Sequence, residues 1–138
     1  MRSATWRSSA RALSALALAA AALTGCGVDV QTPDLFLVTR TGQGAPLTMI
    51  INYDGGVTCN GHRGKILPDK LLLAARSLPG TLEPDAQKKL DPPSPPGSVY
   101  RFKVSLQYGT FSFPDTSAAH RPELARLEQV VLEAQPSC

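Results

Sequence analysis

The stretch that decides the fold is residues 99–113, which read VYRFKVSLQYGTFSF. Residues 100–108 alternate between apolar and polar side chains, and this period of two predicts a strand with one buried face. A tight turn at Tyr108 and Gly109 would reverse the chain and pair Leu106 with Phe111, which keeps the aromatic side chains on one face. We therefore predict an antiparallel hairpin.

Three more strands are predicted upstream of this hairpin. They cover residues 34–40 (DLFLVTR), 47–53 and 57–59. A three-residue turn with a left-handed glycine would pair Tyr53 with Val57 and Ile51 with Cys59, so that apolar side chains share one face. Residues 60–64 (NGHRG) are predicted to form a second turn.

Two helices complete the set of predicted elements. The first opens at Pro68 and Asp69 and runs to about Leu78, where Pro79 and Gly80 are expected to break it. The second is amphipathic and covers residues 122–135. Its side chains expected in water are Glu123, Arg126, Glu128 and Glu133.

These elements predict one small α+β domain in the order β-β-β-α-β-β-α. An antiparallel sheet of about five strands would carry the apolar faces, with both helices packed on one side. The other sheet face would present Thr48, Asn52, Arg101, Lys103 and Gln107. Arg101 and Lys103 could meet an anion or an acidic partner there, and a solvated sheet face is the alternative.

The N-terminal segment has the pattern of an export signal. Three arginines precede a short apolar run at residues 12–23, which is too short to span a bilayer as a helix. Residues 23–26 (LTGC) then resemble the lipobox of bacterial lipoproteins. The resemblance implies a diacylglyceryl group on the Cys26 thiol and cleavage before Cys26; the alternative is an ordinary secretory signal with a chance cysteine.

This interpretation divides the chain into a signal peptide (1–25), a tether (26–33) and a folded domain (34–138). The lipid would hold the protein at the extracytoplasmic face of the cell membrane, because two acyl chains anchor stably. Residues 27–33 extend at most about 25 Å, so the domain would stay close to that membrane.

The charge balance argues against nucleic acid as a partner. The whole chain carries 14 Lys and Arg and 11 Asp and Glu, a formal net charge of +3. Three arginines belong to the signal segment, which holds no acidic residue, so the remainder is formally neutral. The only charge excess therefore belongs to the export signal.

Cys59 and Cys138 remain once Cys26 is assigned to the lipid. A cysteine pair outside the cytoplasm predicts a disulfide, here closing a loop of about 80 residues. One alternative is a metal site, because Cys59 and His62 have a C-x-x-H spacing to which Cys138 and His120 could add ligands. Another is a pair of free thiols.

The sequence holds no motif of a known catalytic or cofactor site. It lacks a G-x-S-x-G elbow, a P-loop, an H-E-x-x-H pair and a dinucleotide fingerprint. Asp115, Ser117 and His120 are triad residue types, but they lie too close together in sequence to form a triad without an unusual turn. We therefore assign no catalytic, metal or cofactor-binding residue and expect no enzyme.

The mature chain resembles a group of small predicted lipoproteins of high-GC Gram-positive bacteria, the actinobacteria. The phrases that carry this resemblance are residues 34–36 (DLF), 54–56 (DGG), 59–61 (CNG), 96–99 (PGSV), 109–111 (GTF) and Cys138. It implies a location in the cell envelope. The chain is also weakly similar to secreted subtilisin-inhibitor-like proteins, although it lacks their second pair of disulfide cysteines.

These observations favour a non-enzymatic, membrane-anchored interaction module with an envelope protein as partner. The alternative hypothesis is protease inhibition, which needs an exposed, rigid loop, and residues 91–98 (DPPSPPGS) are the candidate. A third hypothesis is a small hydrolase that uses Ser117 and His120.

Overall fold

A computed structural model of the chain describes residues 34–138. The predicted signal peptide (1–25), Cys26 and the tether (26–33) lie outside the described residues. The strands are β1 (Asp34–Gly42), β2 (Leu47–Asn52), β3 (Gly56–Cys59), β4 (His62–Ile66), β5 (Tyr100–Leu106) and β6 (Gly109–Pro114). The helices are α1 (Asp69–Gln87), α2 (Pro122–Ala134) and two short 3-10 helices, η1 (Asp115–Ala119) and η2 (Gln135–Ser137).

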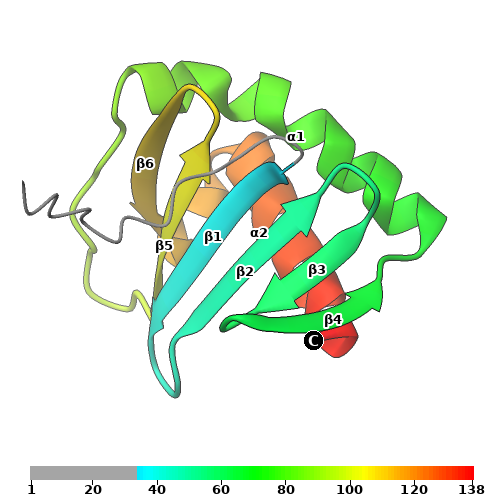
Figure 1. Cartoon of the computed structure of the whole chain (residues 1–138). Coiled ribbons are helices and arrows are strands. Elements are labelled where there is room, and N and C mark those ends of the chain that lie inside the picture. Colours follow the sequence, from blue (N-terminus) through cyan, green and yellow to red (C-terminus); the bar gives the residue numbers. More distant parts are fainter. Residues whose placement is uncertain (1–33) are drawn as a thin grey trace, which may run out of the picture.

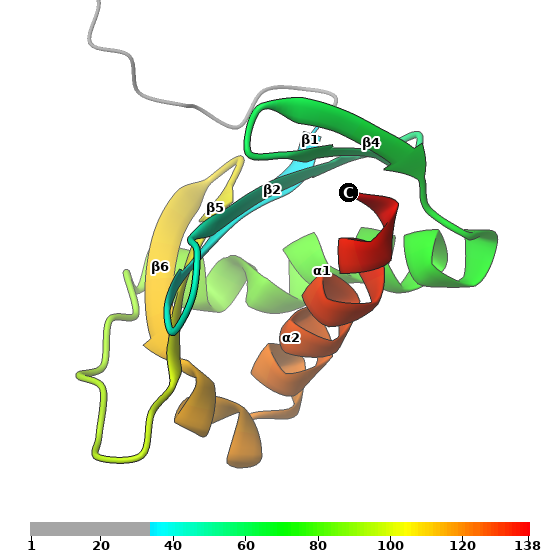
Figure 2. The same cartoon turned by 90° about the horizontal axis from the view of Figure 1, so that it is seen from below.

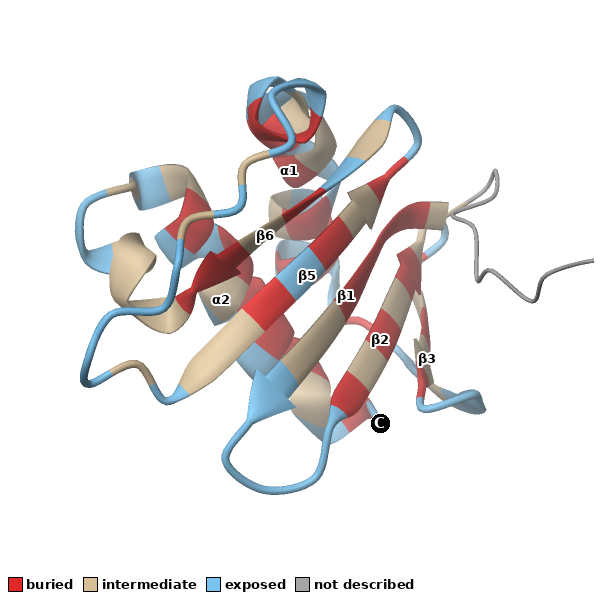
Figure 3. Ribbon diagram, turned by 90° about the vertical axis from the view of Figure 1, so that its left-hand side faces the viewer, coloured by how far each residue is buried: buried red, intermediate tan, exposed pale blue. Residues whose placement is uncertain are grey.

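The predicted α+β class is confirmed. The strands form one antiparallel sheet in the order β4-β3-β2-β1-β5-β6, which Figure 1 shows face on. Both helices cover the concave face of this curved sheet, and no helix of residues 34–138 covers the other face (Figure 2). Alternate side chains along β2, β3 and β5 are buried under the helices, as the red bands along β2 and β5 in Figure 3 show.

The core lies between the sheet and the two helices. The β5–β6 hairpin supplies three phenylalanines, and Phe102 stacks on Phe113 with ring centroids 5.2 Å apart. Ile51 from β2 and Leu127 from α2 are also fully buried. None of the helices between residues 34 and 138 is long and apolar enough to cross a membrane.

The sheet has a sixth strand, β4, where a turn at residues 60–64 was predicted. Asn60 and Gly61 alone form the turn, both with positive φ (49° and 80°). His62 then pairs with Cys59 across the β3–β4 hairpin. The strand is polar and lies at the sheet edge, so it lacks the apolar alternation that identifies an interior strand.

Both predicted hairpin registers are wrong by two residues. In the β2–β3 hairpin Ile51 pairs with Val57, because the turn begins one residue earlier than predicted and leaves Tyr53 exposed. In the β5–β6 hairpin Leu106 pairs with Gly109. A shift of two keeps each side chain on its face, so the apolar faces are those predicted.

Helix α1 continues past Leu78 to Gln87, through Pro79 and Gly80, so the predicted break is wrong. Leu78 and Leu82 are both fully buried, on either side of the predicted break. Packing of this face against the sheet outweighs the loss of one helical hydrogen bond at the proline.

Candidate functional site: a pinned proline-rich loop

The loop of residues 91–98 joins α1 to β5 and is the most exposed proline-rich segment among residues 34–138. Residues 93–97 are all exposed (Figure 3). The loop runs beside β6 toward the end of the sheet at which β1 joins β2 (Figure 1). Just before it, the backbone N–H of Ser112 in β6 donates to the Leu90 carbonyl oxygen at 2.7 Å. The chain entering the loop is thus fixed to the edge strand.

Arg101 of β5 pins the first half of this loop. Its Nη1 donates to the carbonyl oxygen of Pro92 at 2.9 Å and to Oγ of Ser94 at 3.0 Å. Its Nη2 forms an ion pair with the Asp91 carboxylate. A guanidinium is a rigid fork of donors, so these contacts fix the loop at three positions.

Asp115, the first residue of η1, pins the second half of the loop. Its Oδ1 accepts hydrogen bonds from Ser98 Oγ at 2.8 Å and from the backbone N–H of Thr116 at 2.9 Å, and both oxygens lie 3.2 Å from the Val99 nitrogen. Burial acts to raise the pKa of this carboxyl group, but the hydrogen bonds outweigh it and the pKa is lowered. Asp115 therefore stays charged and keeps its hold at neutral pH.

The tip of the loop is a tight turn. The backbone N–H of Ser98 donates to the Pro95 carbonyl oxygen at 3.2 Å, and Gly97 has φ of 89°. Proline at the second turn position and a left-handed glycine at the third are the requirements of a type II turn, which Pro96 and Gly97 meet. Sequence and side-chain contacts thus favour the same loop conformation.

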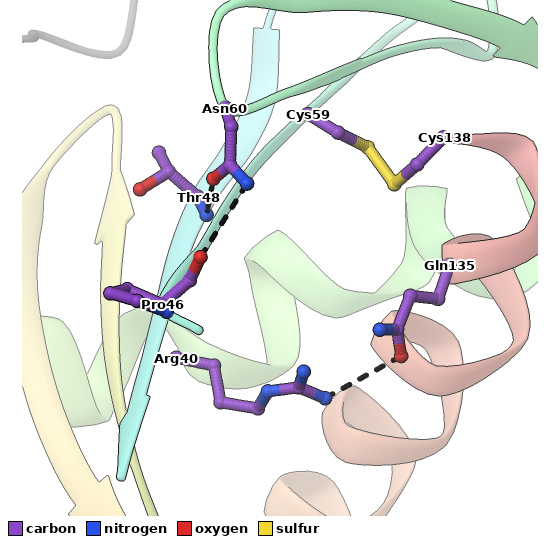
Figure 4. Close-up of a disulfide and its surroundings, with 7 residues drawn as sticks. All are labelled: Arg40, Pro46, Thr48, Cys59, Asn60, Gln135 and Cys138. Carbon is purple, nitrogen blue, oxygen red and sulfur yellow. Dashed lines mark hydrogen bonds between the residues drawn. A yellow bond between two sulfur atoms is a disulfide. The ribbon is translucent and has the colours of Figure 1, made fainter. Parts of the chain in front are cut away.

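The disulfide lies away from this loop and joins β3 to the C-terminal end of the chain. Cys59 and Cys138, the pair predicted from the sequence, are bonded (Figure 4). Figure 4 also shows Asn60, whose Oδ1 accepts from the Thr48 N–H at 2.7 Å. His62 pairs with Cys59 across the hairpin, but the disulfide occupies both cysteine sulfurs. Within residues 34–138 no three His, Cys, Asp or Glu side chains gather as metal ligands.

The structure does not bring Asp115, Ser117 and His120 together as a triad. Ser117 lies in η1, and His120 follows it with an exposed side chain. Their one hydrogen bond in the described chain is between backbone atoms, from the His120 N–H to the Ser117 carbonyl oxygen at 3.2 Å. The Asp115 carboxylate is engaged with the loop. The geometry therefore gives the hydrolase hypothesis no support.

The sequence did not indicate the role of Arg101 or the burial of Glu128. Arg101 was expected on an open polar face, and its side chain instead holds the loop. Glu128 was expected in water, but its Oε1 is buried without a hydrogen-bond partner in the part of the chain that the structure describes. Burial, and secondarily the charge of Asp115, raise the pKa of Glu128 to about 7. The position of Glu128 beside the apolar stripe of α2 was the sequence feature that could have indicated this burial.

Comparison with known proteins adds no relative. No protein-family model, no curated protein and no solved structure matches the chain.

Proposed function

We propose that the protein is a lipid-anchored, extracytoplasmic binding module that presents the loop of residues 91–98 to a protein partner. The lipobox-like residues 23–26 support the anchor. The disulfide between Cys59 and Cys138 supports an oxidising compartment outside the cytoplasm. The observation that carries the binding role is an exposed loop that Arg101 and Asp115 hold at both ends.

The position of the loop suits a module held at a membrane. Asp34, where the tether joins the domain, and Gly42 are the two ends of β1, about 26 Å apart at the usual rise of a strand. Gly42 pairs with Tyr100 at the start of β5, so the tip of the loop lies at the Gly42 end. The loop is therefore at the end of the sheet farther from the point at which the tether joins the domain.

The pinning of the loop favours recognition by another protein. A partner that binds an already ordered segment avoids most of the entropy cost of ordering it. The loop has no charge after Asp91, and proline-rich extended segments fit grooves lined by aromatic side chains. We therefore infer a partner with such a groove.

Affinity capture from envelope membranes tests this function. The bait is the full-length lipidated protein, compared with a loop variant, Pro95→Ala/Pro96→Ala, and with Leu132→Ala, which changes an exposed residue of α2. We expect the wild type and the Leu132 variant to capture the same protein, identified by mass spectrometry, and the loop variant to lose it. Capture that the loop variant leaves unchanged, or capture of background only, contradicts the proposal.

Inhibition of a secreted protease is a second candidate, favoured by the same exposure and pinning of the loop. Titration of secreted serine proteases with the protein separates the two functions. The binding-module proposal predicts unchanged protease activity at micromolar protein. Stoichiometric inhibition that Arg101→Met weakens would favour the inhibitor instead, because Arg101 holds the loop in its exposed form.

A further inference from the structure

A hollow of about 280 Å³ lies at the other end of the sheet, near the start of β1. Tyr53 in the β2–β3 turn and Tyr108 in the β5–β6 turn line it, one from each side of β1 in the sheet order. Their side chains are 55% and 69% exposed. Both turns lie at the end of the sheet that α1 crosses (Figure 1). The hollow is distinct from the proline-rich loop and contains none of its residues.

In the described part of the chain, no hydrogen bond that holds these two turns comes from a tyrosine ring. At Tyr53 it is the backbone carbonyl oxygen that accepts hydrogen bonds, from Nη2 and Nε of Arg76 at 2.6 and 3.1 Å. The β2–β3 turn is closed by Asn52, whose Oδ1 accepts from the Gly56 N–H at 2.8 Å. Two large rings that line one hollow are thus available to a ligand.

The helix beside the hollow has a composition that packing does not explain. Pro79 and Gly80 of α1 both line the hollow, in the middle of a 19-residue helix. Glycine at such a position costs about 1 kcal/mol relative to alanine. A Cβ at Gly80 would meet no atom within 4 Å, so no neighbour requires a glycine there. A glycine at this position leaves the hollow without a side chain from residue 80.

The polar groups of the hollow are a carboxylate and an amide. Glu83 of α1 and Gln107 of the β5–β6 turn line it, and Glu83 Oε1 already accepts from Gln87 Nε2 at 3.0 Å, which fixes its orientation. The Glu83 carboxylate is an acidic group, and no Lys or Arg among residues 34–138 lines the hollow, so an anionic ligand would be repelled. These groups suit an uncharged ligand rich in hydroxyls.

We propose that this hollow binds a neutral sugar ring, either in a free saccharide or in the headgroup of a glycolipid. A pyranose ring has an apolar C–H face, which packs on an aromatic ring, and hydroxyl edges, which bond to carboxylate and amide groups. The hollow lies just below the range of roughly 300–1,000 Å³ of small-molecule sites, which suits one ring of a longer saccharide.

The test measures sugar binding by the full-length protein in a detergent without a sugar headgroup. The probes are chitotriose, maltotriose and short-chain diglucosyl diacylglycerol, with short-chain diacylglycerol as the control without a sugar, and binding is followed by saturation-transfer NMR. Binding of a free trisaccharide identifies a free ligand. Binding of the glycolipid alone identifies a headgroup. Either result supports the site, whereas equal binding of the glycolipid and its sugar-free control, or binding of no probe, overturns it.

Variants then locate the binding. Tyr108→Ala and Gly80→Leu should each weaken it about tenfold, because one removes a ring and the other fills the hollow. Gly80→Leu also favours the helix, so misfolding does not explain a loss of binding there. Tyr108→Phe keeps the ring and should keep most of the affinity, as should Leu132→Ala on α2. Binding that Tyr108→Ala and Gly80→Leu leave unchanged overturns the proposal.

Discussion

Removal of the disulfide is expected to destabilise the domain by about 4 kcal/mol. Cys59 and Cys138 are 79 residues apart in sequence, and closing a loop of this size restricts the unfolded chain by about 4.5 kcal/mol in the chain-entropy model. The folded state should change little in the variant Cys59→Ala/Cys138→Ala, because Leu124 and Leu127 hold α2 in the core without the bond. Only η2 (Gln135–Ser137) is expected to fray.

Urea unfolding followed by circular dichroism measures this loss, with Leu132→Ala as a surface control. We expect the midpoint to fall, and the m-value to rise because the unfolded chain without the bond exposes more surface. Amide exchange should show α2 protected and η2 exposed in the variant. A loss below 1 kcal/mol, with α2 still protected, would refute the inference that the bond stabilises by constraining the unfolded chain.

Three further substitutions test other parts of the structure. Glu128 has its pKa raised to about 7 by burial and by Asp115, so wild-type stability should fall as the pH rises from about 4.5 to 7. Glu128→Gln should remove that slope. It should also raise the free energy of unfolding by about 1–2 kcal/mol above pH 7, a figure that is discounted for the partial exposure of the side chain. An unchanged slope in urea titrations would contradict the burial of Glu128. Arg121→Met should cost about 2–3 kcal/mol, because it leaves the buried Asp85, 2.6 Å away, without its cation; a urea-measured loss below 1 kcal/mol would argue against this pair. Gly80→Ala should gain about 1 kcal/mol by thermal unfolding, and no gain would contradict the open space above this residue.

The faces of the sheet were predictable from the sequence, but the registers were not. A period of two assigns each side chain to a face, and registers that differ by two residues bury the same set. Contacts within the turn determine which of these registers forms. Asn52 Oδ1 accepts from the N–H groups of Asp54 and Gly56, and Gly55 takes the left-handed conformation with φ of 87°. These contacts end β2 at Asn52, before Tyr53.

The register of the β5–β6 hairpin was also not predictable from local sequence, because it depends on a tertiary contact with α1. A Cβ at Gly109 would lie 2.9 Å from the Ala86 carbonyl oxygen, so the C-terminal part of α1 approaches this turn closely. That approach depends on α1 reaching Gln87, through the proline expected to end it at Leu78. Local rules for proline thus gave a wrong helix end, because long-range burial decided it.

The candidate loop was identifiable from its composition, but its rigidity was not. Prolines at residues 92–96 indicate a stiff segment, and the sequence does not reveal that Arg101 and Asp115 bind it. These two residues come from a strand and from a 3-10 helix that lie beside the loop only in the folded chain. In sequence, Arg101 looks like any surface arginine, and Asp115 looks like any aspartate at the start of a helical turn.

The membrane anchor is tested most directly by mass spectrometry of the mature protein isolated from cell membranes. The account predicts that the mature chain begins at Cys26 and that its N-terminal cysteine carries a diacylglyceryl group. An unmodified chain that begins at another residue, or one that retains residues 1–25, would contradict the anchored-module function.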